Sequence, residues 1–325
     1  MLPSQFPKIA TGEKQQASFS RSLEEIRSPA HNLARIDLAA LSNLSRAQLA
    51  QFQAVWQDIP AERRQELAAA LLELSEERFD LTFNDIFKWL LQDQDPRVRS
   101  LAVEGLWEDD DVRQITPLIS LLRSDASAEV RAAAALSLGR FVLLGELEEI
   151  DRQAATRVED ALRQAYHHDE YDLTVQRRLL ESLAYSGQED VEETILEAYQ
   201  SGDPAMQISA VFAMGRNASK RWRPIVLAEL SSSDDAIRFE AVRASGELDL
   251  KAAVPALIAL LGESDIDLRD SAIWALGQIG GQQARRALRA CSKSDDEELR
   301  EAALESLAEL DLFSDLDDLG TLYTQ

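Results

Sequence analysis

Apolar residues recur along most of the chain three or four positions apart, which is the spacing of one face of an α-helix. The first two intervals between successive copies of this pattern are 32 and 45 residues long, and the four later intervals are each 31 residues long. Such regularity predicts a stack of similar structural units. The seven copies align without gaps and begin at Val98, Val130, Val175, Met206, Ile237, Leu268 and Leu299.

Each copy has the features of a capped helix. Aspartate or serine lies three residues before the start, where its side-chain oxygen can accept a hydrogen bond from a free amide of the first turn. Positions 0, +4 and +8 are mostly apolar or small, as in Leu268, Ala272 and Leu276, and they share one helical face. The repeated alanine lets a neighbouring helix approach closely.

Arginine or glutamine stands at position +1, directly after each start. We expect Arg238, Arg269 and Arg300 to bridge to aspartates of neighbouring turns, in a structural role. A further helix precedes each capped helix, and in 224–230 and 255–261 it opens with proline, which the first turn of a helix tolerates.

The composition of the 325 residues favours the same architecture. Helix formers dominate, while 13 glycines and 9 prolines are few for this length, and strand-type alternation is nearly absent. We therefore predict an all-α fold, an α-solenoid (α-α superhelix) of stacked helix pairs, because one helix pair cannot bury both of its faces alone.

The repeat resembles the HEAT family, and within it the short HEAT-like repeats first noted in phycobilisome lyases. The residues that carry the resemblance are Asp-Ile-Asp-Leu-Arg-Asp-Ser-Ala-Ile-Trp-Ala-Leu-Gly at 265–277 and their equivalents, over roughly residues 85–312. The resemblance implies a helical array whose second helices line a concave side. It implies little about function, because such arrays serve as scaffolds, adaptors, lyases and nucleic-acid enzymes.

Departures from the repeat define the other parts of the chain. Residues 1–30 show little periodicity and are expected to form a mobile N-terminal tail, and residues 31–92 an irregular helical N-terminal cap that supplies bulky apolar surface. Residues 93–312 form the repeat array, with an acidic insertion near 145–172 that accounts for the long interval. Residues 313–325 form either an acidic C-terminal tail or a closing helix.

The balance of acidic and basic residues indicates which class of partner the protein binds. With 34 basic and 58 acidic residues, the formal net charge is −24, which argues against nucleic acid because such binding depends on neutralising phosphates. Apolar runs are too short to span a membrane, and the first ten residues lack the pattern of a secretory signal. The single Cys291 cannot form an intramolecular disulfide, which fits the cytoplasmic location that we expect.

No sequence motif indicates a catalytic centre. There is no phosphate-binding loop or nucleophile elbow, and the glycines of 277–281 fit a helix end followed by a turn. His167 and His168 are adjacent, so their side chains point apart, and a third metal ligand would have to come from elsewhere. Deoxyhypusine hydroxylases, a HEAT-like family, bind iron through His-Glu pairs, which this chain lacks. We expect no catalytic residues, no metal and no cofactor.

Positions +2, +6 and +10 lie away from the face that positions 0, +4 and +8 share. In the middle copies they carry aromatic residues and arginine, the types enriched at binding hot spots. Alternatively, the groove is narrow and these side chains pack on one another. The candidate partner-binding residues are Arg177, Tyr185, Ile208, Phe212, Arg216, Phe239, Arg243 and Trp274.

These observations predict a non-enzymatic, monomeric scaffold or adaptor that binds a protein or peptide segment of a partner in its concave groove. Two alternatives stay open. One is a HEAT-like nucleic-acid enzyme of the DNA glycosylase type. Such enzymes use tryptophan, arginine and aspartate on their concave side, and these are weakly resembled here by Trp274, Arg243 and Asp270. The other is a lyase-like chaperone for a tetrapyrrole, which only the generic repeat supports.

Overall fold

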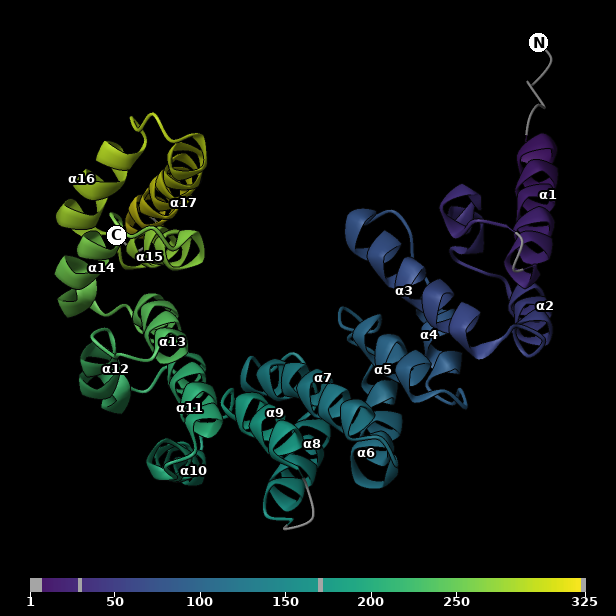
Figure 1. The fold of residues 1–325 in the computed structure, drawn as a ribbon, viewed down its shortest axis with the longest axis horizontal. Coiled ribbons are helices and arrows are strands. Elements are labelled where there is room, and N and C mark those ends of the chain that lie inside the picture. Colours follow the sequence, from purple (N-terminus) through teal and green to yellow (C-terminus); the bar gives the residue numbers. More distant parts are fainter. Residues whose placement is uncertain (1–7, 29–30, 169–171, 323–325) are drawn as a thin grey trace. The chain divides into compact units, whose positions relative to one another are not determined.

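The computed structural model describes residues 8–28, 31–168 and 172–322. Within these ranges it contains seventeen α-helices, five 3₁₀-helices and no β-strand, so the predicted all-α fold is confirmed (Figure 1). The chain divides into two compact units, Met1–Val175 and Gln176–Gln325. No helix in the described ranges is both long enough and apolar enough to cross a membrane.

The first unit holds the off-register cap and the first repeats. In it, α3 packs on α5 and α5 packs on α7, so α3 takes the place in this row that the second helix of a repeat would take. Beside the row, α4 packs on α5, while α6 and α8 pack on α7. The elements are α1 (Lys8–Arg27), η1 (Leu33–Arg35), η2 (Leu38–Leu41), α2 (Arg46–Trp56), α3 (Ala61–Glu77), α4 (Asn84–Leu90), α5 (Pro96–Glu104), η3 (Val112–Gln114), α6 (Ile115–Ser124), α7 (Ala128–Glu146), α8 (Arg152–Tyr166) and α9 (Leu173–Leu183), which crosses into the second unit.

The second unit is a regular two-layer stack. One layer consists of α11, α13, α15 and α17, each packed on the next, and α10, α12, α14 and α16 each pack on the helix that follows them (Figure 1). This is the helix-pair stacking of an α-solenoid. The elements are α10 (Glu189–Gln200), α11 (Pro204–Asn217), η4 (Lys220–Trp222), α12 (Arg223–Glu229), α13 (Asp235–Glu247), η5 (Lys251–Ala253), α14 (Val254–Leu260), α15 (Ile266–Ile279), α16 (Gly281–Cys291) and α17 (Glu297–Leu322).

The repeat register of the sequence is confirmed by burial and by the helix caps. In α15, Leu268, Ala272 and Leu276 are all buried, as the 0, +4 and +8 positions require. Ser127 alone among the expected caps makes no side-chain hydrogen bond to its helix. The caps that accept from a first-turn backbone amide are Asp95, Asp172, Asp203, Asp234, Asp265 and Asp296.

The start of the chain differs from the expected mobile tail. Residues Lys8–Arg27 form helix α1, and Phe19 and Ile26 on this helix are fully buried. The apolar stripe escapes notice in the sequence because it is short and preceded by a polar run. At the other end, α17 continues without a break from the last repeat to Leu322, as in the closing-helix alternative.

The irregular interval is taken up mainly by longer helices. Helix α7 has 19 residues and α8 has 15, whereas α13 and α12 in a regular repeat have 13 and 7. Both long helices carry a buried apolar face, so the extra residues extend the core rather than forming a free loop.

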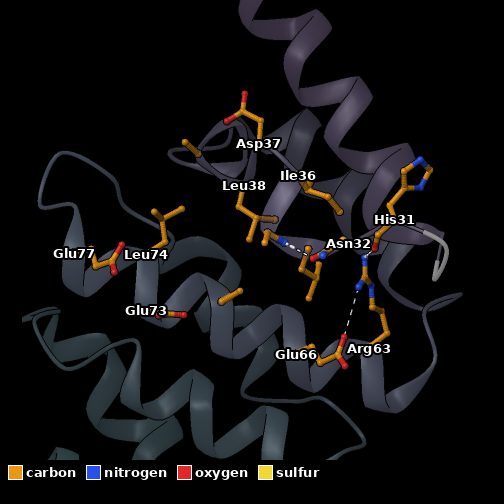
Figure 2. A pocket seen from close by; sticks show the side chains of 14 residues that line it. His31, Asn32, Ile36, Asp37, Leu38, Arg63, Glu66, Glu73, Leu74 and Glu77 are labelled. Carbon is orange, nitrogen blue, oxygen red and sulfur yellow. Dashed lines mark hydrogen bonds and ion pairs between the residues drawn. The ribbon is translucent and has the colours of Figure 1, made fainter.

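A wide hollow lies within the N-terminal cap. Residues 31–39 run along one side of it and α3 along the other, and its volume is about 1050 Å³ (Figure 2). Arg63 of α3 reaches across, donating a hydrogen bond to the His31 carbonyl oxygen at 2.7 Å while pairing with Glu66. The half-buried Leu74 and carboxylates of α3 also line it, so the surface is of mixed polarity.

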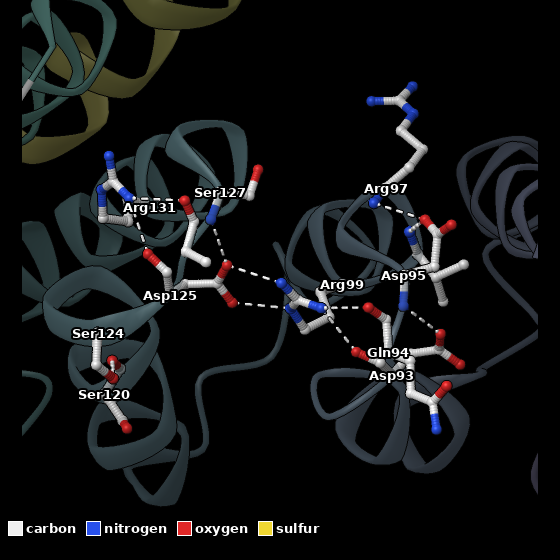
Figure 3. Close-up of polar contacts among 12 residues, drawn as sticks. Asp93, Gln94, Asp95, Arg97, Arg99, Ser120, Ser124, Asp125, Ser127 and Arg131 are labelled. Atoms are coloured by element: carbon white, nitrogen blue, oxygen red, sulfur yellow. Dashed lines mark hydrogen bonds and ion pairs between the residues drawn. The ribbon is translucent and has the colours of Figure 1, made fainter.

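Four of the five arginines at position +1 close the loop of their own repeat. Each of the four donates from Nη1 to the backbone carbonyl oxygen six residues earlier, which lies in the loop two residues before the helix cap. Figure 3 shows two of these bonds, from Arg99 and from Arg131. The four pairs of this kind are Arg99 with Asp93, Arg131 with Asp125, Arg238 with Ser232, and Arg300 with Ser294.

Arg99 also ties its repeat to the next one. Its guanidinium forms two hydrogen bonds to the Asp125 carboxylate, both 2.8 Å long (Figure 3). Burial acts to raise the pKa of Asp125, but the hydrogen bonds from Arg99 and from the Ser127 amide hold this pKa below its ordinary value. The carboxylate is therefore charged and fixed between two repeats.

The expected bridges between turns are present for one of the three arginines. Arg269 pairs with Asp296 of the next repeat at 2.9 Å, which confirms the prediction. For Arg238 and Arg300 the prediction is wrong, because each of them pairs with a carboxylate in the first turn of its own helix and donates to its own loop.

Candidate partner-binding surface

The predicted partner-binding residues occupy successive helices of the second unit. They lie on α9 or the turn after it, on α11, on α13 and on α15, and each is half-buried. We call the surface that they form the α9–α15 face. It consists of Arg177, Tyr185, Ile208, Phe212, Arg216, Phe239, Arg243 and Trp274.

Arginines and aromatic rings alternate on this face. The guanidinium carbon of Arg216 lies 5.4 Å from the centre of the Phe212 ring and 6.0 Å from that of Tyr185. The guanidinium carbon of Arg243 lies 5.9 Å from the same Phe212 ring. These are cation–π distances, so side chains at equal repeat positions lie side by side, as the register predicts.

Carboxylates behind the face hold its arginines. Arg216 pairs with Glu247 of α13 at 3.3 Å. Burial raises the pKa of both Glu240 and Glu247, and the nearby Arg216 and Arg243 oppose this effect. Arg216 is thus fixed in place by a partly buried acid, and the guanidinium groups of Arg216 and Arg243 both lie near the Phe212 ring.

A buried polar link joins α9 to α11. Ser209 donates a hydrogen bond of 2.6 Å to the carboxylate of Glu181, which is only 5% exposed. Arg177 donates to the Ser209 hydroxyl at 2.8 Å, and Arg178 pairs with the other oxygen of Glu181. The network fixes Arg177, so this member of the predicted set has a structural contact of its own.

Trp274 is positioned by a close approach between helices. A Cβ atom at Gly246 of α13 would lie 2.8 Å from the indole, so the ring rests where only glycine leaves room. In the described part of the chain no cation–π contact joins Arg243 to Trp274. The indole of Trp274 lies against Gly246 of α13 instead.

The described residues offer no ready metal centre. No group of three or more histidine, cysteine, aspartate or glutamate side chains in the described ranges could hold a metal ion. His167 and His168 lie at the end of α8, and the residues that follow, 169–171, lie outside the described ranges. Burial raises the pKa of the Cys291 thiol, which disfavours its reactive thiolate.

Comparison with known protein families identifies the type of repeat. The family model for HEAT repeats matches residues 83–173 and 223–308, which together are more than half of the chain. The search of curated proteins finds no match.

One similar solved structure supports the fold, and a second is reported beside it. The complex of CpcE and CpcF of phycocyanin lyase from Nostoc sp. PCC7120 is 15% identical with a TM-score of 0.54, over 93% of this chain and 98% of that chain. Human deoxyhypusine hydroxylase in complex with glycerol is 20% identical with a TM-score of 0.36, over 94% of this chain and 99% of that chain. At 15% identity the likeness to the phycocyanin lyase complex shows the fold alone.

Proposed function

The chain belongs to the HEAT-repeat family, and we propose that it is a non-enzymatic scaffold whose α9–α15 face binds an extended or helical segment of a partner protein. Arrays of this kind present long surfaces built from equivalent positions of successive repeats. The same face is the one that the sequence singles out.

The observation that carries the proposal is the alternation of rings and guanidinium groups on the α9–α15 face. Tyr185, Phe212 and Trp274 are half-buried, so each keeps part of its ring accessible. Aromatic residues and arginine are the side chains that most often act as anchors in interfaces. An apolar and cationic surface of this kind on one layer of a stack is unusual for a protein with a net charge of −24.

Fixed arginines suit a particular kind of ligand. Arg216 and Arg243 are oriented by ring stacking, and Arg216 also by Glu247, so their remaining donors lose little freedom on binding. A partner segment with apolar side chains for the ring surfaces and a carboxylate for an arginine satisfies both kinds of group. Nucleic acid does not, because the partly buried Glu240 and Glu247 stand close to the same arginines.

Site-specific photo-crosslinking tests the proposal. We expect p-benzoylphenylalanine at Phe239 to crosslink one partner protein in cells of the source organism. The same group at Leu227, which is exposed on α12 of the other layer, serves as the matched control and should not crosslink it. Equal crosslinking from both positions would contradict the proposal.

Binding of the crosslinked segment is then measured with purified protein. Phe212→Ala combined with Trp274→Ala should weaken binding by about 2 kcal/mol or more, since central anchors carry most of the energy of an interface. Because Trp274 packs on Gly246, the thermal midpoint of each variant is measured as well. Phe239→Ser should weaken binding without a shift in midpoint, and unchanged binding in all these variants would rule out this face.

A further inference from the structure

A second cavity lies in the first unit, far in sequence from the α9–α15 face. It is bounded by the end of α3, by the turn at 78–83 and by the end of α5 with the loop that follows it, and its volume is about 460 Å³. Phe83, at its base, is buried, and the main chain of Gly105 forms part of its wall.

Two aromatic side chains in this cavity are not covered by the protein. Phe79 is 86% exposed and Trp107 is 47% exposed, and both line the cavity. The neighbouring Phe83 and Phe87, from the same aromatic run in the sequence, are buried in the core. Exposing large rings lowers the stability of a protein slightly and generally marks an interaction site when they gather at one place.

Ion pairs lie next to both aromatic residues. Arg78 and Asp80, on either side of Phe79, form two hydrogen bonds of 2.8 Å with each other. Arg140 of α7 donates to the Trp107 carbonyl oxygen and also pairs with Asp110 at 2.7 Å. These contacts join the two residues that flank Phe79 and restrain the main chain at Trp107.

The charged groups of the cavity are all acidic. Glu76, Glu104 and Glu108 line it, each exposed, and no lysine, arginine or histidine among the described residues does so. An electron-rich ring face together with carboxylates attracts a cation, and the attraction is strongest for a guanidinium or ammonium group carried on an apolar stem. The arginines nearby are already paired outside the cavity.

We infer that this cavity, the Phe79–Trp107 pocket, receives an arginine or lysine side chain from a basic segment of a partner protein. The apolar stem lies against the two rings, and the cationic head meets the three glutamates. This site is independent of the α9–α15 face, which has the opposite polarity of exposed charge and lies in the other unit.

The inference is tested on the full-length protein labelled with 5-fluorotryptophan. The probe is an acetylated octapeptide of glycine and serine with one central arginine, and the control peptide has glutamine in its place. We expect the ¹⁹F resonance of Trp107, assigned with Trp107→Phe, to shift saturably with the arginine peptide only. The resonance of Trp89, which packs on Phe52 and Trp56, is the internal reference and should not move.

Variants separate the contributions of ring and charge. Phe79→Leu keeps apolar area but removes the ring, and it should weaken the peptide roughly two- to fivefold. Glu104→Gln with Glu108→Gln should weaken it further and flatten the salt dependence of binding. These side chains are exposed, so the thermal midpoint should stay unchanged in every variant.

The inference is overturned by any of three results. One is the absence of a saturable shift, and another is equal binding of the arginine and glutamine peptides. The third is saturation by tetramethylammonium but not by the peptide, which would assign the pocket to a small free cation. The inference is supported if the arginine peptide binds more weakly to the Phe79 and glutamate variants while the α9–α15 face stays unchanged.

Discussion

At the residue scale, two glycines of the second unit lie where neighbouring helices pack closely. A Cβ atom at Gly215 would lie 2.3 Å from the Glu247 carboxylate and 2.9 Å from the Cα atom of Ala244. Gly246 stands in the same relation to α15, with Trp274 and the backbone of Ala275 nearby. Both glycines are therefore packing residues of the helix row, since they let the next helix come close.

The first prediction at this scale concerns these glycines. Gly246→Ala should overpack the contact between α13 and α15 and lower the free energy of unfolding by about 1–3 kcal/mol, because backbone atoms of Ala275 cannot move aside easily. The measurement is urea denaturation followed by circular dichroism. Gly262→Ala is the matched control, since its Cβ would meet nothing closer than a carbonyl oxygen at 3.9 Å, and it should change stability by less than about 0.5 kcal/mol.

The sequence identifies the residues of the α9–α15 face but not their individual contacts. Repeat register decides which positions leave the core, so Phe212 and Arg243 could be assigned to neighbouring places on one row. Whether Trp274 turns to Arg243 or to Gly246 depends on side-chain rotamers, which the register leaves free. For the same reason the exposure of Phe79, four residues before the buried Phe83, could not be read from the sequence.

At the scale of the element, the recurrent feature is the arginine that closes the loop between the two helices of a repeat. The loop carbonyls that accept from Arg131, Arg238 and Arg300 precede the capping residue, so cap and arginine together satisfy main-chain groups on both sides of the turn. The sequence predicts the caps because a side-chain oxygen at the N-cap has one obvious donor. It does not predict the arginine's acceptor, because loop carbonyls and neighbouring aspartates are both within reach of a long side chain.

The stability that the ion pair between Arg99 and Asp125 contributes should depend on pH. Since the pKa of Asp125 is lower in the folded protein than its ordinary value of 3.8, the carboxylate adds stability above that value and loses it as the pH falls through the folded-state pKa. Asp125→Asn should therefore cost about 2–3 kcal/mol at pH 7, and the gap between the variant and the wild type should narrow steadily below about pH 4.

The experiment is urea denaturation from pH 7 down to pH 3. Glu129→Gln is the control, since its pair with Arg97 is half-exposed on both sides and should contribute about 1 kcal/mol or less. A constant difference between Asp125→Asn and wild type across this range would show that the effect is one of shape and not of charge.

At the scale of the whole molecule, contacts within the second unit run between neighbours. Each helix of the α11 to α17 layer packs on the next, so stability is distributed over interfaces instead of being concentrated in one core. The 31-residue repeat predicts this arrangement, and the family match agrees with it. Helix α1 and the cavity at Phe79 belong to the off-register part of the chain, where no repeat relates one residue to another and sequence reasoning has least to use.

A substitution that destabilises one repeat should therefore also destabilise the repeats that pack on it. Ala272 is fully buried, and Ala272→Trp should overpack α15 and destabilise the second unit by roughly 1–3 kcal/mol or more. In native-state hydrogen exchange, we expect protection to fall most in α13, α15 and α17 and less in α11. Equal loss of protection in every helix of the chain would instead indicate a single cooperative unit.

Because the arginine bonds to a carbonyl of its own loop, donor and acceptor belong to the same repeat. A segment that spans one repeat keeps the arginine, the cap and this carbonyl together only if it begins before the carbonyl. The carbonyl belongs to Ser232 in one repeat and to Ser294 in another. We expect that segments cut before these residues can be duplicated, deleted or exchanged without leaving this carbonyl unpaired, which gives both evolution and the protein engineer a way to change the order of anchors on a binding face one repeat at a time.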